Sequence, residues 1–337
     1  MKEIFIHGKV NSYRKIFRFF PIFLLVFLSL VSCASRKAAQ AEEYFSIGMA
    51  YYEMGKFAEA EQWLTRARAA DRTLTASEYN LGRIAYENGR FEEAAKFFES
   101  ILKKDPDNIM ALKSAAYSRI KNGDLFKAET HYNKVLLLVP DSVDDGFNYA
   151  LVLYGIKKYN ESEEVLKRFP FALEENPSSM LLLARNQKAL NKVEAIDSYA
   201  NWAAAGKSTA LGLYEYAQVL ESSELYAKAI EQYRAAISLL PVDTVEMKRN
   251  KLWFETARLL LTADPENSEG LRNLNNAVNE GFTDTKEIEK LLLDDRIGQP
   301  AKDEIKKIID NILNKDKVKE ETPDENNTEE TAEEIPA

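Results

Sequence analysis

The sequence predicts an all-α fold built from repeated helical hairpins. The first observation behind this prediction is self-similarity, because residues 44–64 superpose on residues 78–98 at a shift of 34 positions. The second is that small residues recur at two fixed places in each 34-residue unit. The third is that glycine and proline stand where helices would turn or end. A chain with such a period is expected to stack one helical hairpin on the next.

Small residues mark where the two helices of each hairpin, A and B, approach closely. A larger side chain at repeat position 8 on helix A or position 20 on helix B would push the helices apart, and a larger residue at position 17 fills the space beside them. Position 8 holds Gly48, Gly82, Ala116, Ala150, Ala184 and Ala217; position 20 holds Ala60, Ala94, Ala128, Ser162 and Ala229; position 17 holds Phe57, Phe91, Leu125, Tyr159, Val193 and Tyr226.

Helix boundaries are marked by glycine at the turn between A and B, where a positive φ is easily accommodated, and by proline after helix B. The fifth repeat departs from this pattern, with Asn191 at the turn and Ile196 at the small position, and prolines interrupt residues 168–179. We therefore expect the fifth hairpin to pack differently. The regular boundary residues are Gly55, Gly89 and Gly123 at turns and Pro106, Pro140 and Pro241 after helix B.

This 34-residue pattern resembles the tetratricopeptide repeat (TPR) family. The resemblance implies a right-handed superhelical solenoid with six TPR-like repeats over residues 41–243. Residues 277–297 are similar to an ending seen in many TPR proteins, which implies a capping role. We expect a degenerate hairpin and C-terminal cap helices over residues 244–315, followed by an acidic, disordered tail over residues 316–337. One face of the last cap helix carries Ile305, Ile308, Ile309 and Ile312.

The N-terminus predicts export. Five basic residues precede a thirteen-residue apolar stretch, residues 19–31, which is shorter than the roughly 20 residues that a membrane span needs. The following Leu-Val-Ser-Cys segment resembles a bacterial lipobox. This implies that residues 1–32 are a cleaved signal peptide, that Cys33 carries lipid, and that residues 33–40 form a linker; the alternative is an uncleaved signal anchor. Lipid on Cys33 would hold the protein in the cell envelope, with the outer membrane as the expected site, on its periplasmic or surface face.

Composition argues against several classes of function. The net charge is −9, whereas a nucleic-acid binder needs a basic face. The chain has one cysteine, two histidines and none of the common nucleotide-binding or metalloprotease motifs. His131 is interpreted as a partly exposed helical residue, and acidic neighbours such as Asp144 and Asp145 as solvated charges. We therefore expect no catalytic residue, no metal site and no cofactor.

The resemblance also places a ligand groove. In TPR proteins, several helix A positions line the concave face, and here they carry aromatic and basic residues of the kinds that anchor binding. The alternative is that these rings pack against neighbouring repeats. The family's carboxylate clamp is absent, so a terminal-carboxylate ligand is not implied. The candidate groove residues are Phe45, Met49, Tyr52, Tyr79, Arg83, Tyr86, Lys113, Tyr117, Phe147 and Tyr154.

These features together predict a lipid-anchored adaptor that binds an envelope protein or peptide. Two alternatives stay open at this point. One is an accessory subunit of a periplasmic solute-binding or transport system, which a homo-oligomer would favour. The other is a structural factor in outer-membrane or cell-wall assembly.

Overall fold

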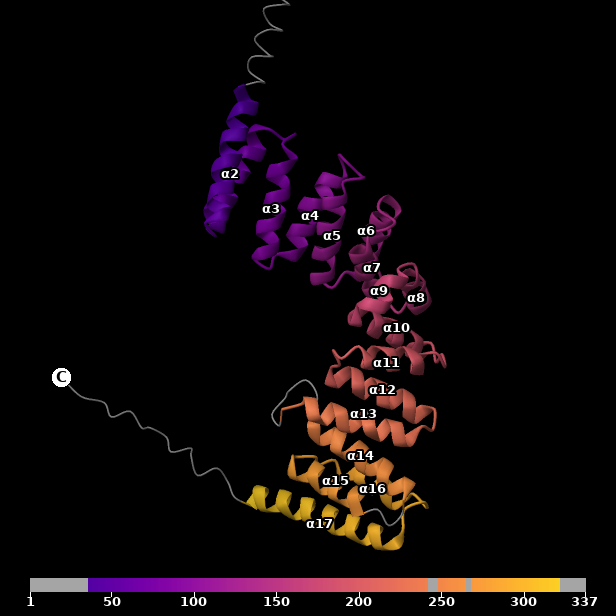
Figure 1. Cartoon of the computed structure of the whole chain (residues 1–337). Coiled ribbons are helices and arrows are strands. Elements are labelled where there is room, and N and C mark those ends of the chain that lie inside the picture. Colours follow the sequence, from indigo (N-terminus) through magenta and orange to yellow (C-terminus); the bar gives the residue numbers. More distant parts are fainter. Residues whose placement is uncertain (1–35, 242–247, 265–267, 322–337) are drawn as a thin grey trace, which may run out of the picture. The chain divides into compact units, whose positions relative to one another are not determined.

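The computed structural model describes residues 36–241, 248–264 and 268–321, and these residues form helices and connections without a strand (Figure 1). The predicted signal peptide, Cys33 and the end of the acidic tail lie outside the described residues. The described chain divides into two compact units between Phe169 and Pro170, within the proline-interrupted segment. The all-α prediction is confirmed for the described residues.

The first unit consists of four helical hairpins. Its first helix covers residues 36–53, and each later helix packs against the next one along the chain. The remaining helices are α2 (Phe57–Ala70), α3 (Thr75–Glu87), α4 (Phe91–Leu102), α5 (Ile109–Lys121), α6 (Leu125–Leu138), α7 (Val143–Gly155) and α8 (Tyr159–Lys167).

The second unit begins with a short helix and continues with three hairpins and two further helices. Its helices are α9 (Pro170–Glu175), α10 (Pro177–Ala189), α11 (Ala195–Ala204), α12 (Ala210–Ser222), α13 (Tyr226–Leu239), α14 (Arg249–Ala263), α15 (Ser268–Asn279), α16 (Thr285–Leu292) and α17 (Gln299–Glu321). Helix α17 extends through Glu321, into the segment that the sequence predicted to be a disordered tail.

The predicted small positions lie at the helix contacts. All six position 8 residues and the five small residues at position 20 are buried. At Gly48 an added Cβ would lie 2.8 Å from Leu64 Cγ, and at Gly82 it would lie 2.7 Å from Phe98 Cε1. Real Cβ atoms do not approach neighbours that closely, so these sites require the absence of a side chain.

The turn between helices A and B has the same backbone conformation in all six repeats. The residue seven places after position 8 always has a positive φ, although only three of the six are glycine. Lys157, Asn191 and Glu224 accept this conformation at 64°, 55° and 61°. The hairpin spacing therefore imposes the left-handed turn even where the residue type does not favour it.

The fifth hairpin departs from the predicted register of helix B. Val193, predicted to fill the space beside the small position, is 76% exposed. Helix α11 begins only at Ala195, which is 1% exposed and takes the buried place expected for Ile196. Ile196 is half-buried beside the same core. In the regular hairpins, helix B begins two residues after the residue with positive φ. In the fifth hairpin that residue is Asn191, and helix B begins only four residues later, at Ala195.

The last helix, α17, packs its isoleucine face against the helices before it. Ile305, Ile308, Ile309 and Ile312 on α17 are buried in one cluster with residues of α14, α15 and α16, including Leu274. The amphipathic face of α17 thus covers the apolar side of the preceding hairpin, which would otherwise face water.

Enlarging a small position should destabilise the fold. Ala94 is fully buried at the contact between α3 and α4, so Ala94→Leu should lower the free energy of unfolding by roughly 1–3 kcal/mol through overpacking. Thermal unfolding of the full chain measures the effect. Lys96→Leu on the same helix is the control, because its side chain is 69% exposed. Equal midpoints for the two variants would show that the repeat register is wrong.

Candidate functional site

The candidate groove residues all lie on A helices of the first unit. Phe45, Met49 and Tyr52 lie on the helix over residues 36–53. The others are Tyr79, Arg83 and Tyr86 on α3, Lys113 and Tyr117 on α5, and Phe147 and Tyr154 on α7.

A pocket of about 320 Å³ is lined by residues of α3, α5 and α7, together with one residue each of α4 and α6. Four of the predicted residues line it: Arg83, Tyr86, Lys113 and Tyr117. The other six do not. The remaining lining residues, which the sequence reasoning did not select, are Glu87, Phe98, Ser114, Ser118, Tyr132, Asp145 and Asn148.

Most of the predicted aromatic residues pack within their own hairpin. Tyr52 and Tyr154 lie 5.4 Å, between ring centroids, from the position 17 rings Phe57 and Tyr159. Tyr79 lies 5.2 Å from Phe98, and its hydroxyl is 3.0 Å from Ser114 Oγ. The alternative placed these rings against neighbouring repeats, but the ring contacts lie within one hairpin, while the Tyr79 hydroxyl reaches Ser114 of the next repeat.

Tyr86 and Tyr117 are two of the four aromatic residues that line the pocket. Their ring centroids are 5.6 Å apart, and Tyr117 is 47% exposed. Burial, together with the neighbouring Tyr117, raises the pKa of Tyr86 to about 12. Tyr86 is therefore neutral at physiological pH, and the two rings offer an apolar surface with hydroxyl groups at its edge.

The basic residues of the site already have partners. The Arg83 guanidinium lies 4.5 Å from the centroid of the Tyr52 ring and donates to Asn80 Oδ1 at 3.0 Å. Lys113 Nζ is 2.9 Å from Asp145 Oδ2. These contacts hold both cations at the pocket rather than leaving them free in solvent.

Asp145 was predicted to be a solvated charge, and this prediction was wrong. The residue is only 2% exposed, and its Oδ2 accepts a hydrogen bond of 2.6 Å from the Ser142 hydroxyl. Asp145 lies in the first turn of α7, where the helix favours negative charge. A serine three residues before an acidic residue is a helix-start signal, and it could have revealed this position.

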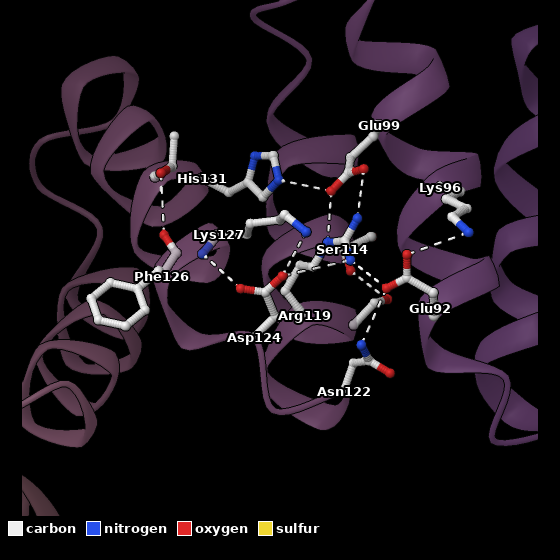
Figure 2. Close-up of polar contacts among 12 residues, drawn as sticks. Glu92, Lys96, Glu99, Ser114, Arg119, Asn122, Asp124, Phe126, Lys127 and His131 are labelled. Atoms are coloured by element: carbon white, nitrogen blue, oxygen red, sulfur yellow. Dashed lines mark hydrogen bonds and ion pairs between the residues drawn. The ribbon is translucent and has the colours of Figure 1, made fainter.

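A second polar cluster joins α4, α5 and α6 (Figure 2). Arg119 is 3% exposed and donates through Nε and Nη2 to the two carboxylate oxygens of Glu99, at 2.7 and 2.8 Å. Its Nη1 bonds to Glu92, and His131 Nε2 lies 3.5 Å from Glu99. This arrangement fixes one hairpin to the next through a buried arginine.

The pKa shifts in this cluster follow from burial and charge. Burial lowers the pKa of His131 against the opposing effect of Glu99. For Glu99, burial raises the pKa, but hydrogen bonding and charge from Arg119 and His131 outweigh it, so the pKa is lowered overall. His131 was interpreted as a partly exposed helical residue, and its side chain is 15% exposed.

Metal and membrane features can be assessed only for the described residues. Among them, no group of three histidine, cysteine, aspartate or glutamate side chains is arranged to hold a metal ion. No helix in the same part of the chain is both long and apolar enough to cross a bilayer.

Comparison with known proteins agrees with the fold. The family described as "Tetratricopeptide repeat" matches residues 45–109. A tetratricopeptide repeat protein from Parabacteroides merdae has a similar structure, with a TM-score of 0.52 and 19% identity over 76% of this chain and 100% of that one. YrrB, described as a TPR protein with an unusual peptide-binding site, is 18% identical over 53% of this chain and 92% of that one, with a TM-score of 0.46.

A sequence relative adds a second similarity. An uncharacterized lipoprotein of Treponema pallidum is 25% identical over 149 residues, which are 44% of this chain and 76% of the relative. The family match covers residues 45–109, and the fold of the described residues is similar to that of a tetratricopeptide-repeat structure.

The cluster around Glu99 should make stability depend on pH. Because the pKa of His131 is lowered by folding, the unfolded chain binds the proton more readily, and stability is lost as the pH falls below about 6.5. His131→Gln should therefore flatten the decline in the free energy of unfolding between about pH 7 and pH 5.

Urea unfolding of the full chain across this window measures the difference. The carboxylate of Glu99 contributes its own loss only at lower pH, because its pKa is lowered as well. Parallel pH profiles for the wild type and the His131→Gln variant would contradict the burial of this imidazole.

Proposed function

We propose that this chain is an adaptor that binds an extended segment of a partner protein along α3, α5 and α7. The observation that carries the proposal is the pocket to which α3 contributes Arg83 and Tyr86, α5 contributes Lys113 and Tyr117, and α7 contributes Asp145. Aromatic and arginine side chains around a concave, partly apolar site are typical of binding hot spots.

The dimensions of the site favour a segment rather than a folded domain. A pocket of about 320 Å³ accommodates one side chain or a small group, so further contacts must come from the neighbouring helix surfaces. Along α5 the surface continues to Lys121, whose Nζ lies 5.8 Å from the centroid of the Tyr117 ring. A partner lying across the three helices would meet both features.

We further propose that the chain is exported and anchored in the cell envelope by lipid on Cys33. The support comes from the lipobox-like segment and from the Treponema pallidum relative that is named as a lipoprotein. A diacylglycerol group with an additional acyl chain would give stable attachment. The adaptor would then present its groove next to a membrane.

The proposal of a binding groove is tested by replacing the tyrosine residues of the groove with alanine. The partner is first captured with the tagged wild-type chain from its native membrane and identified. The triple variant Tyr86→Ala, Tyr117→Ala, Tyr154→Ala should then weaken binding of that partner, by about 2 kcal/mol or more if these rings are hot spots. Binding is measured by calorimetry and unfolding by circular dichroism on the same samples.

Two controls separate binding from stability. Tyr117→Ala alone removes the most exposed of the three rings, and so should disturb packing least. The variant Phe126→Ala, Leu137→Ala removes apolar side chains of α6 that are 67% and 75% exposed and lie outside the pocket. Full binding by a folded triple variant would place the binding site elsewhere.

The anchor is tested by Cys33→Ala. This change should abolish lipid labelling and leave the uncleaved precursor, because no thiol remains to accept diacylglycerol. Cells supplied with a clickable fatty acid report the labelling, and an immunoblot reports the size. Equal labelling of wild type and variant would contradict the lipobox interpretation.

A further inference from the structure

One residue that lines the pocket, Asp145, has a buried carboxylate oxygen that is left without a partner. Asp145 is only 2% exposed, and no hydrogen-bond donor within the described residues reaches its Oδ1. Both of its contacts, with Ser142 and Lys113, involve the other oxygen, Oδ2. An ionised carboxylate can accept about four hydrogen bonds, and a buried acceptor left unpaired costs about 1–3 kcal/mol.

The surroundings of this oxygen suit a positively charged group. The pocket wall includes the aromatic side chains of Tyr86, Phe98, Tyr117 and Tyr132. Aromatic faces attract cations, most strongly where water is partly excluded. A cation on an apolar stem could therefore contact the rings with its stem while its N–H groups reached the carboxylate.

The four charged residues at the pocket sum to zero, because Arg83 and Lys113 balance Glu87 and Asp145. Arg83 is engaged with Tyr52 and Asn80, and Lys113 is engaged with Asp145. Glu87 also lines the pocket, is exposed, and forms no ion pair with any described residue. Glu87 and one oxygen of Asp145 thus remain as carboxylate acceptors for a ligand, and carboxylates form their strongest hydrogen bonds with positively charged donors.

We propose that this pocket is a specificity pocket for a lysine or arginine side chain of the bound partner segment, with the Asp145 carboxylate as its hydrogen-bond acceptor. The inference rests on the proposed adaptor function and adds the chemistry of the ligand. The volume of about 320 Å³ matches a single long side chain better than a larger element. Glu87 at the exposed side would attract the cation before it reaches Asp145.

The test uses the full chain purified in detergent and blocked pentapeptides of glycine and serine with one central variable residue. That residue is lysine, arginine, norleucine or glutamate, and binding is followed by ligand-observed nuclear magnetic resonance. We expect saturable binding of the lysine or arginine peptide, and none of the norleucine or glutamate peptide. Norleucine is the matched control because it has an unbranched apolar stem without the charge.

Variants of the protein connect the binding to the pocket. Asp145→Asn should weaken binding of the basic peptide about ten-fold, as expected for the loss of a charge-assisted hydrogen bond. Glu87→Gln should weaken it by a smaller factor. Glu164→Gln on α8, which removes an exposed charge outside the pocket, should leave it unchanged. If Asp145→Asn does not fold, Glu87→Gln decides, because that side chain makes no described ion pair.

Several outcomes would overturn the proposal. Equal binding of the norleucine and lysine peptides would show that charge is not recognised. No binding of any peptide, or unchanged binding by both pocket variants, would assign Asp145 Oδ1 to a buried water instead. Butylammonium and butylguanidinium form a separate arm, and tighter binding of these than of the peptides would indicate a small cationic ligand rather than a partner segment.

The result is distinguishable from a failure of the adaptor function. If the tyrosine variants lose the captured partner but no basic peptide binds, only the side-chain specificity is wrong. If basic peptides bind at the pocket while the partner binds the tyrosine variants as tightly as the wild type, the pocket does bind a cation and the adaptor interface lies elsewhere.

Discussion

The close approach of helices A and B at the small positions is the constraint on which the other features depend. Gly48 and Gly82 meet Leu64 and Phe98 at distances that leave no room for a Cβ atom. This contact sets the distance between helices A and B. The connection from the end of A to the start of B must then reverse the chain direction within three residues. That requirement explains why Lys157 and Glu224 adopt a positive φ that their side chains disfavour.

The hairpins could be predicted from the sequence because their packing repeats with the chain. A small residue that recurs every 34 positions reports the same helix contact each time, so the period alone located most hairpins. The fifth repeat shows the limit of this reasoning. Val193 occupied the correct place in the register but lies in solvent, because the start of α11 depends on its local boundary and not on the period.

The sequence predicted where the candidate site lies, but not which of its side chains are buried and which are exposed. The family pattern placed Arg83, Tyr86 and Tyr117 on one side of successive helices, and they meet at one pocket. Pattern alone could not show which rings were covered, since that depends on neighbours such as Phe57 and Phe91. Asp145 was missed because its main partner, Lys113, lies on another helix and far away in sequence.

Two buried charges in the first unit differ in how completely they are satisfied. Arg119 has carboxylate partners on both sides of its guanidinium, an arrangement that holds hairpins together and leaves little capacity for a ligand. Asp145, which lines the pocket, is paired through one oxygen only, and its other oxygen has no partner among the described residues. A fold that can satisfy a buried charge fully, as it does at Arg119, leaves one half-satisfied where a ligand completes the set. This contrast favours a ligand-binding role for the pocket and a stabilising role for the cluster around Arg119.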